Sequence, residues 1–381
     1  MITPIFFLFL LFVSVIYWLL PIQKSRNIFL SIASLGFISY FDKFATLLVI
    51  VLTLNTYWFG FLIERKRNKK LFHVIGIIGI MTTLVFFKYF GLLQQTVNAV
   101  TGFLRLLPAF EIKKILLPLG ISYITFKHIS YLTDIKWGKI EKGLFVDFFC
   151  YSSLFTIFVA GPIERFEKFN PQISKQTIQF QTNYVSFAFR RIIFGLFKKL
   201  VIANWIGYFI NPLWNEYSEL NITLKLVILF GYSIQIYMDF AGYSDIAIGS
   251  SKLFGLKIME NFNWPYLQPN ISQFWRHWHI SLSEWFKDYL YFPLGGSRNG
   301  LKRTIFNVII VFMLCGFWHG QEWHFVIWGL WHGIGISIFQ LWNYYTRKNK
   351  KLSLITNKDW FILLSRVSTF LFVTFGWWWF R

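Results

Sequence analysis

The stretch that decides the fold is Ala45-Thr-Leu-Leu-Val-Ile-Val-Leu-Thr-Leu-Asn-Thr-Tyr-Trp-Phe-Gly-Phe-Leu-Ile63, followed directly by Glu64-Arg-Lys-Arg-Asn-Lys-Lys70. The apolar run carries no charged side chain and is long enough to cross a bilayer as a helix. Basic residues directly after such a run are typical of its cytoplasmic end. The sequence therefore predicts a membrane-spanning helix here.

Similar apolar runs lie on both sides of this one, at residues 1–20, 28–40 and 73–93. Residues 1–20 have neither a basic region before them nor a small-residue cleavage site after them, so we expect a retained helix rather than a signal peptide. Lys24, Arg26 and the basic residues 65–70 flank a pair of spans. Both basic loops are expected in the cytoplasm, which predicts an N-terminus outside.

The composition of the whole chain also indicates a membrane protein. Hydrophobic residues make up 55% and charged residues 14%, with a mean hydropathy of +0.49, so polar groups are too few to coat a soluble globule of 381 residues. The formal net charge is +21, and the basic residues collect between apolar runs. This pattern favours contact with anionic lipid and excludes a nucleic-acid-binding protein.

Beyond residue 93 the apolar segments become shorter, at residues 115–126, 144–159, 192–210, 222–240, 247–254, 305–341 in two parts, and 360–380. Short segments at membrane depth survive where protein shields them or where they line a wet cavity. The polar stretch 164–183 is expected to be an interfacial loop or amphipathic helix. We predict an all-α polytopic membrane protein, one domain over residues 1–381, with roughly ten to twelve helices, some short or re-entrant, around a central tunnel.

Two Trp-His-Gly triplets, Trp318-His319-Gly320 and Trp331-His332-Gly333, lie in the otherwise apolar stretch 311–339. Histidine moves protons near neutral pH, and polar groups are costly in lipid, so we interpret this stretch as the active site. If residues 311–317 are helical, His319 lies near the end of that helix beside glycines that allow close approach. His332, on the next helix, is expected to face the same cavity. The structural alternative is that each histidine is an interhelical hydrogen-bonder.

A third histidine lies in a segment that begins as the loop Asn261-Phe-Asn-Trp-Pro-Tyr-Leu-Gln-Pro-Asn270. We expect a helix capped by Asn270 or Ser272 and continuing to residue 288, which would place Arg276, His279 and Ser283 on one face. An arginine beside a histidine on an aromatic helix suits an anionic or polarised substrate group. The alternative is an interfacial helix that Trp and Arg side chains anchor among the headgroups.

Two further features leave alternatives open. Asp239, in Tyr237-Met-Asp-Phe-Ala-Gly-Tyr-Ser-Asp245, is expected either to pair with a base such as Arg276 or to line an aqueous path. Cys315 precedes His319 by one helical turn, so it is either a packed side chain or a thiol acyl carrier.

The sequence has no metal-ligand pattern, nucleophile elbow, P-loop or dinucleotide fingerprint, so no metal or tightly bound cofactor is expected. A transporter or flippase and a noncatalytic scaffold are the rival functions.

An ordered set of motifs resembles the membrane-bound O-acyltransferase (MBOAT) family from about residue 80 onward. The motifs are Leu117-Pro-Leu-Gly-Ile-Ser-Tyr-Ile-Thr-Phe126, Ala160-Gly-Pro-Ile-Glu-Arg165, residues 237–245, Phe274-Trp-Arg-His-Trp-His-Ile-Ser-Leu-Ser-Glu-Trp-Phe-Lys-Asp-Tyr-Leu-Tyr-Phe-Pro-Leu-Gly-Gly-Ser-Arg298, Gly316-Phe-Trp-His-Gly320 and Trp328-Gly-Leu-Trp-His-Gly333. The chain is most similar to the bacterial branch that acetylates alginate and other cell-envelope polysaccharides and that also contains the D-alanyl transferases of teichoic acid.

The resemblance implies a bacterial inner-membrane enzyme that transfers an acyl group, expected to be acetyl, from a cytoplasmic thioester to polysaccharide hydroxyls. By motif His319 corresponds to the catalytic base and His279 to a second polar residue of the site. Acetyl-CoA or an acylated carrier protein is the expected donor, and a separate extracytoplasmic O-acetyltransferase is the expected partner. Substrate contacts are expected from Trp275, Arg276, Trp318, Asp239 and His332.

Two departures from the family pattern accompany this resemblance. Relatives continue past the motif that resembles Thr374-Phe-Gly-Trp-Trp-Trp-Phe-Arg381, so we expect this chain to lack one or two final helices. Glu322 and His324 stand where relatives more often carry small or apolar residues, which predicts a locally altered site.

Overall fold

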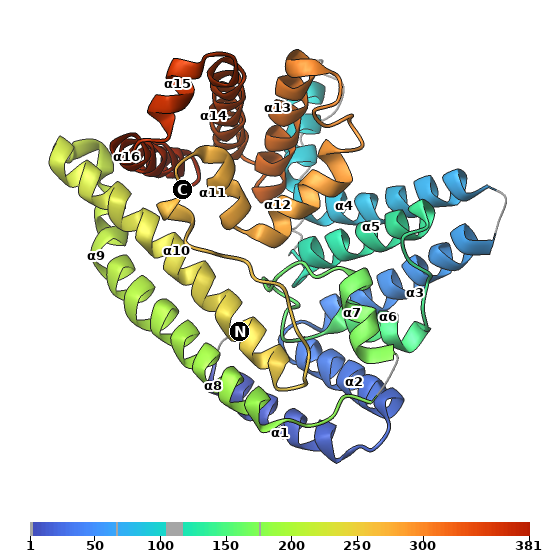
Figure 1. The fold of residues 1–381 in the computed structure, drawn as a ribbon. Coiled ribbons are helices and arrows are strands. Elements are labelled where there is room, and N and C mark those ends of the chain that lie inside the picture. Colours follow the sequence, from blue (N-terminus) through green and yellow to red (C-terminus); the bar gives the residue numbers. More distant parts are fainter. Residues whose placement is uncertain (1–2, 66–67, 104–116, 175–176) are drawn as a thin grey trace. The chain divides into compact units, whose positions relative to one another are not determined.

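The computed structural model describes residues 3–65, 68–103, 117–174 and 177–381. Within these ranges the chain forms sixteen α-helices with short π- and 3-10 segments and no strand (Figure 1). The prediction of an all-α architecture is confirmed. Parts of four predicted segments lie outside the described residues, namely residues 1–2, 66–67, 115–116 and 175–176.

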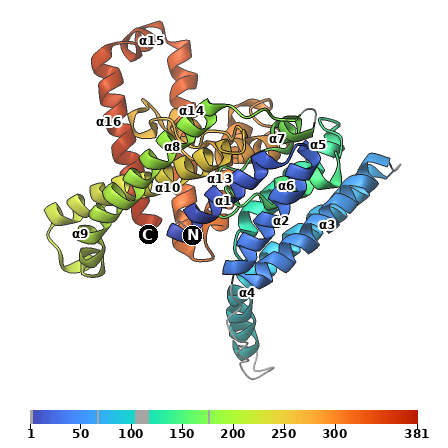
Figure 2. The same cartoon turned by 90° about the horizontal axis from the view of Figure 1, so that it is seen from below.

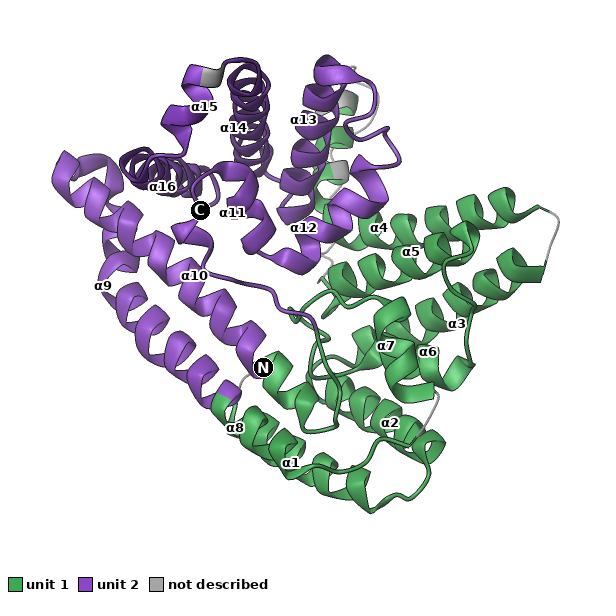
Figure 3. Ribbon diagram, viewed as in Figure 1, with its two compact units in different colours: residues 1–190, 247–258 green, residues 191–246, 259–381 purple. Residues whose placement is uncertain are grey.

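Two compact units divide the chain (Figure 3). Unit 1 comprises Met1–Arg190 and Ala247–Ile258. Its helices are α1 (Pro4–Leu19), α2 (Gln23–Phe41), α3 (Lys43–Arg65), α4 (Lys69–Phe103), α5 (Ile121–Trp137), α6 (Phe145–Ser153), α7 (Phe166–Ser174), the first part of α8 (Thr182–Leu196) and the last part of α10 (Ile222–Lys252). Ile38, Val49, Ile124 and Phe158 form an apolar core in this unit, where α2, α3 and α5 meet.

Unit 2 comprises Arg191–Ile246 and Met259–Arg381. After α8 it contains the π-helical η1 (Phe197–Ala203), α9 (Asn204–Asn215), η2 (Tyr217–Glu219), most of α10, η3 (Pro265–Leu267), α11 (Ile271–His277), α12 (Ile280–Phe286), the π-helical η4 (Lys287–Tyr291), α13 (Gly300–His319), α14 (Trp323–Lys348), α15 (Lys350–Thr356), α16 (Asp359–Gly376) and η5 (Trp377–Trp379). In Figure 2, α14 and α16 run side by side and α15 joins them at one end.

In the described part of the chain, seven helices are long and apolar enough to cross a membrane, which makes the chain a multi-pass membrane protein. They are α3, α4, the helix running through α8, η1 and α9, then α10, α13, α14 and α16. The predicted spans at 45–63 and 73–93 are confirmed as α3 and the body of α4. The helices outnumber the ten to twelve expected because several short ones, of seven to nine residues, connect the spans.

One boundary in the sequence reading was wrong. The segments 222–240 and 247–254 belong largely to a single helix, α10, which continues through Gly242. A Cβ atom at Gly242 would lie 2.7 Å from the carbonyl oxygen of Gly195 and 2.9 Å from the backbone nitrogen of Lys199. The glycine therefore permits close contact between α10 and the helix running from α8 into η1, and it does not break α10.

The hairpin of α13 and α14 carries both Trp-His-Gly triplets, and its two helices cross at glycines. A Cβ at Gly316 would lie 2.2 Å from the carbonyl oxygen of Phe325, and one at Gly329 would lie 2.2 Å from that of Phe312. Only glycine fits at this crossing, because any larger residue would clash with the facing backbone. The close contact brings the C-terminal end of α13, where His319 lies, against the first turns of α14.

Candidate active site

His319 is the last residue of α13, with Gly320 at the C-cap, as the sequence predicts. Its imidazole is half-buried among aromatic rings: the ring centroids of Trp318, Trp328 and Phe380 lie 4.7, 5.0 and 5.0 Å away. The C-terminal end of a helix carries partial negative charge, which stabilises an imidazolium. The position therefore suits a histidine that takes up a proton.

His332 lies on α14 and is fully buried. Its ring centroid is 5.0 Å from that of Trp328, so His319 and His332 contact the same indole. Its Nδ1 accepts a hydrogen bond from Trp275 Nε1 at 3.3 Å. Its Nε2 has no hydrogen-bond partner among the described residues.

The predicted continuous helix from Asn270 to residue 288 was wrong. Asn270 does cap α11, with Oδ1 accepting from the backbone nitrogen of Gln273, but α11 ends at His277 and α12 starts at Ile280. Between them His279 has φ 42° and ψ 54°, in the left-handed region. Arg276, His279 and Ser283 therefore do not share one helix face.

His279 is buried, at 3% exposure, beneath the ring of Phe240 on α10, whose centroid is 4.7 Å away. Its Nδ1 lies 3.2 Å from Oδ1 of Asn261. Burial lowers the pKa of His279 to about 3, because the charged form would lose its hydration. The imidazole is therefore neutral at physiological pH.

A cavity of about 690 Å³ opens beside α11, α12, α13 and α14. Trp275 and Arg276 line it, together with Ser283 and Cys315. Arg276 is exposed there, so the cavity combines a cation with apolar walls. Neither His279, His319, His332, Trp318 nor Asp239 is among its lining residues.

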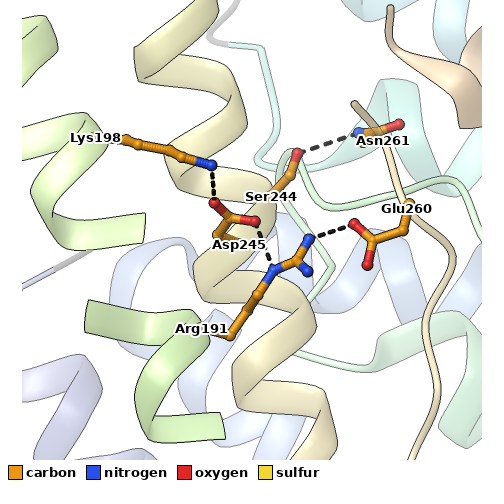
Figure 4. Close-up of polar contacts among 6 residues, drawn as sticks. All are labelled: Arg191, Lys198, Ser244, Asp245, Glu260 and Asn261. Atoms are coloured by element: carbon orange, nitrogen blue, oxygen red, sulfur yellow. Dashed lines mark hydrogen bonds and ion pairs between the residues drawn. The ribbon is translucent and has the colours of Figure 1, made fainter. Parts of the chain in front are cut away.

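Asp239 forms an ion pair with Lys199 on η1, and the partner proposed from the sequence, Arg276, was wrong. The second carboxylate of the motif, Asp245, is buried and accepts hydrogen bonds from Lys198 Nζ and Arg191 Nε, both at 2.6 Å (Figure 4). Charges inside apolar segments persist when they are paired. The adjacent lysines 198 and 199 thus pair with Asp245 and Asp239, which lie six residues apart on α10.

Sequence reasoning missed several polar residues of these segments. Lys198 and Lys199 interrupt the apolar run 192–210, and the later motif 237–245 carries two aspartates, so their pairing could have been anticipated. Arg191 contacts Glu260 as well as Asp245. In unit 1, fully buried His128 on α5 lies 2.9 Å from Thr56 Oγ1 and 2.7 Å from Ser152 Oγ, just beyond the predicted apolar segment 115–126.

Glu322 and His324, for which the sequence predicts a locally altered site, contact each other. His324 Nε2 lies 2.5 Å from Glu322 Oε2, and its Nδ1 lies 2.8 Å from the carbonyl oxygen of Trp379. Both residues are at least partly exposed, next to the turn that follows His319. Among the described residues no group of three or more His, Cys, Asp or Glu could hold a metal ion.

Comparison with known proteins gives a consistent family match. The model of the membrane-bound O-acyltransferase family matches residues 32–358. The chain is 33% identical to a probable alginate O-acetylase of Pseudomonas putida, over 93% of this chain and 71% of that protein. It is 33% identical to the peptidoglycan O-acetyltransferase of Helicobacter pylori, over 100% and 76% of the two chains. It is 30% identical to the teichoic acid D-alanyltransferase of Bacillus subtilis, over 93% and 89%.

Proposed function

Because the chain belongs to the membrane-bound O-acyltransferase family, we propose that it transfers an acetyl group from a cytoplasmic thioester to hydroxyls of a cell-envelope polysaccharide. Alginate and peptidoglycan O-acetylation in the names of its relatives supports this acceptor class. Acetyl-CoA or an acylated carrier protein is the donor. No metal or tightly bound cofactor takes part in the proposal.

His319 is the general base of the proposed reaction. The observation that carries this assignment is its half-buried position at the C-terminal end of α13, whereas His332 is fully buried and its Nδ1 already accepts a hydrogen bond from Trp275. The imidazole removes the proton of the acceptor hydroxyl as the oxygen attacks the thioester carbonyl. The carbon–sulfur bond then breaks, and the proton passes to the departing thiolate to give a free thiol.

The cavity beside Arg276 is the proposed donor site. An arginine can hold a phosphate group of the donor through paired hydrogen bonds, and Trp275 offers an apolar wall to its thioester arm. His279 orients a substrate group or stabilises developing negative charge. Trp318 and His332 shape the surroundings of His319, while Asp239 is a weaker candidate for substrate contact because Lys199 already pairs with it.

The proposed location is the inner membrane of a bacterium, with the N-terminus outside. The basic residues around 24–26 and 65–70 then face the cytoplasm and the anionic lipid of that leaflet. A separate extracytoplasmic O-acetyltransferase is the proposed partner that completes delivery to the polysaccharide.

The decisive experiment is His319→Ala, with His277→Ala as the matched histidine control. His277 lies on α11, where its Nδ1 lies 2.8 Å from the carbonyl oxygen of Gln273 in its own helix. At equal membrane levels, His319→Ala should abolish the ester-linked acetyl groups of the envelope glycans, measured by mass spectrometry, while His277→Ala should retain them. Acetylation at the wild-type level in His319→Ala would overturn the assignment.

His279→Ala tests the second histidine in the same assay. We expect a strong reduction rather than complete loss, because the base remains in place. An unchanged acetyl content would assign His279 to packing alone.

A further inference from the structure

The side chain of Asn261 is fully buried between α10 and the start of α12. Its Nδ2 donates to Ser244 Oγ on α10 at 3.3 Å (Figure 4). Its Oδ1 accepts from the backbone nitrogen of Ser281 at 3.2 Å and from Ser281 Oγ at 2.8 Å. The backbone oxygen of Asn261 accepts from the nitrogen of Ile280 at 2.9 Å. Asn261 is therefore fixed against the first turn of α12 by both side chain and backbone.

These contacts determine which way the amide points. A backbone N–H can only donate, so the atom that faces the nitrogen of Ser281 must be the amide oxygen. If the amide were flipped, its NH₂ group would face the backbone N–H of Ser281, and two donors would meet. The amide nitrogen would also no longer be placed to donate to Ser244 Oγ. The same oxygen lies 3.2 Å from Nδ1 of His279.

The orientation of this amide sets the tautomer of His279. An amide oxygen accepts and does not donate, so Nδ1 must carry the proton in this contact. Because burial keeps the imidazole neutral, Nε2 then carries a lone pair and no proton. A neutral His279 of this tautomer can accept a hydrogen bond at Nε2 but cannot donate one there.

The backbone supports a dedicated role for this arrangement. His279 is one of two non-glycine residues with positive φ among the described residues, and left-handed backbone costs roughly 1–2 kcal/mol for a residue with a Cβ. Such conformations persist where the surroundings enforce them, and they concentrate at functional sites. Here the contacts of Asn261 to Ile280 and Ser281 hold the backbone directly after His279.

We propose that Asn261 is a positioning residue for acyl transfer, which holds His279 with Nε2 as a hydrogen-bond acceptor for a hydroxyl of the acceptor substrate. This inference rests on the proposed function and narrows it: His279 orients a hydroxyl group, and it does not stabilise the oxyanion. Asn261 acts only through His279 and contacts no substrate.

The first test measures the tautomer without any turnover. Nitrogen NMR spectra are recorded on the full chain, labelled with ¹⁵N-histidine and purified in detergent. The wild type is compared with Asn261→Leu and with Asn261→Asp, which keeps an acceptor oxygen. The signals of His279 are identified by their loss in His279→Asn. In the wild type and in Asn261→Asp, Nδ1 of His279 should carry a proton. In Asn261→Leu the Nε2-protonated form should appear. A His279 ring that is Nε2-protonated in the wild type, or unchanged in Asn261→Leu, would overturn the inference.

The second test is a double-mutant cycle on acetyl transfer. Removing the partner that orients a metal-bound histidine typically costs about 10- to 100-fold. We expect a loss of the same order in transfer for Asn261→Leu, and a smaller one for Asn261→Asp. In a His279→Ala background Asn261→Leu should have no further effect, because its influence passes through the imidazole. Equal losses in both backgrounds would contradict a positioning role.

Asn307→Leu is the matched control for the loss of a buried asparagine. Asn307 is also fully buried, and its Nδ2 donates to the carbonyl oxygens of Leu294 and Gly296. Any destabilisation common to buried asparagines should appear in both variants, whereas the change in the His279 spectrum should be confined to Asn261→Leu. Failure of the His319 assignment would leave this spectrum unchanged, so the two proposals fail separately.

Discussion

The indole nitrogen of Trp275 donates a hydrogen bond to Nδ1 of His332 over 3.3 Å, so a neutral His332 carries its proton on Nε2. This tautomer is the opposite of the one that Asn261 imposes on His279. His332 offers a donor and no free lone pair, which makes it unsuited to the role of a base. The hydrogen bond from Trp275 therefore argues against His332 as the base of the proposed reaction.

Replacing Trp275 by phenylalanine should destabilise the protein. The change keeps an aromatic ring but leaves Nδ1 of a fully buried histidine without its donor, which typically costs about 1–3 kcal/mol. Thermal unfolding in detergent should therefore begin at a lower temperature. Trp323→Phe is the control, since Trp323 is 77% exposed. Equal melting of the two variants would argue against a structural role for the Trp275 hydrogen bond.

Gly376→Ala should disturb the same histidine from the other side. The added Cβ would lie 2.9 Å from His332 Nε2 and 3.0 Å from Trp331 Cδ1, so both rings would have to move. Overpacking of this kind typically costs about 1–3 kcal/mol, and acetyl transfer should fall with it. At Gly79 on α4 an added Cβ meets no atom within 4 Å, so Gly79→Ala should be tolerated. A Gly376→Ala protein as stable and active as Gly79→Ala would contradict this packing.

The ion pair of Lys199 and Asp239 can be tested by exchanging its charges. Either Lys199→Asp or Asp239→Lys alone should lower the amount of folded protein in the membrane, because two like charges would then face each other. The double exchange should restore both protein level and envelope acetylation if the pair is structural. Restored protein without restored acetylation would instead indicate that Asp239 itself contacts the substrate path.

Stability should fall as the pH is lowered below the ordinary pKa of histidine. The pKa of His279 is about 3 in the folded protein and 6.5 in the free side chain, so between these values the unfolded chain takes up a proton that the folded protein excludes. The free energy of unfolding should decrease with falling pH, by at most about 1.4 kcal/mol per unit. His279→Asn is the comparison, since asparagine tolerates the left-handed backbone and does not titrate.

Melting curves at pH 7 and pH 5 measure this difference. The drop in melting temperature should be larger for the wild type than for His279→Asn. An identical drop would mean that His279 titrates normally and is not desolvated as its burial implies.

The sequence predicts the long helices well because length and hydropathy determine them locally. The apolar run 45–63 becomes α3, and the boundary at Gly320 is visible in the motif itself. The break between α11 and α12 could not be predicted in this way. No glycine or proline marks it, and it depends on Asn261, which is 18 residues upstream.

The candidate site shows the same division between local and distant information. The need of Asp239 for a basic partner follows from the cost of an isolated charge in lipid, and that part of the prediction is confirmed. The identity of the partner depends on how α10 packs against η1, 40 residues upstream. Helical periodicity also predicted that Arg276, His279 and Ser283 share one helix face. Because the helix is broken at His279, Arg276 and Ser283 line the cavity and His279 does not.

The glycine crossing of α13 and α14 has a consequence for motion. Where facing backbones are separated by hydrogen atoms alone, one helix cannot slide or roll past the other without steric collision. The hairpin must therefore travel as one stiff body, carrying His319 and His332 together. Under the proposed function, any opening that admits the acceptor or releases the thiol has to come from the elements around this hairpin.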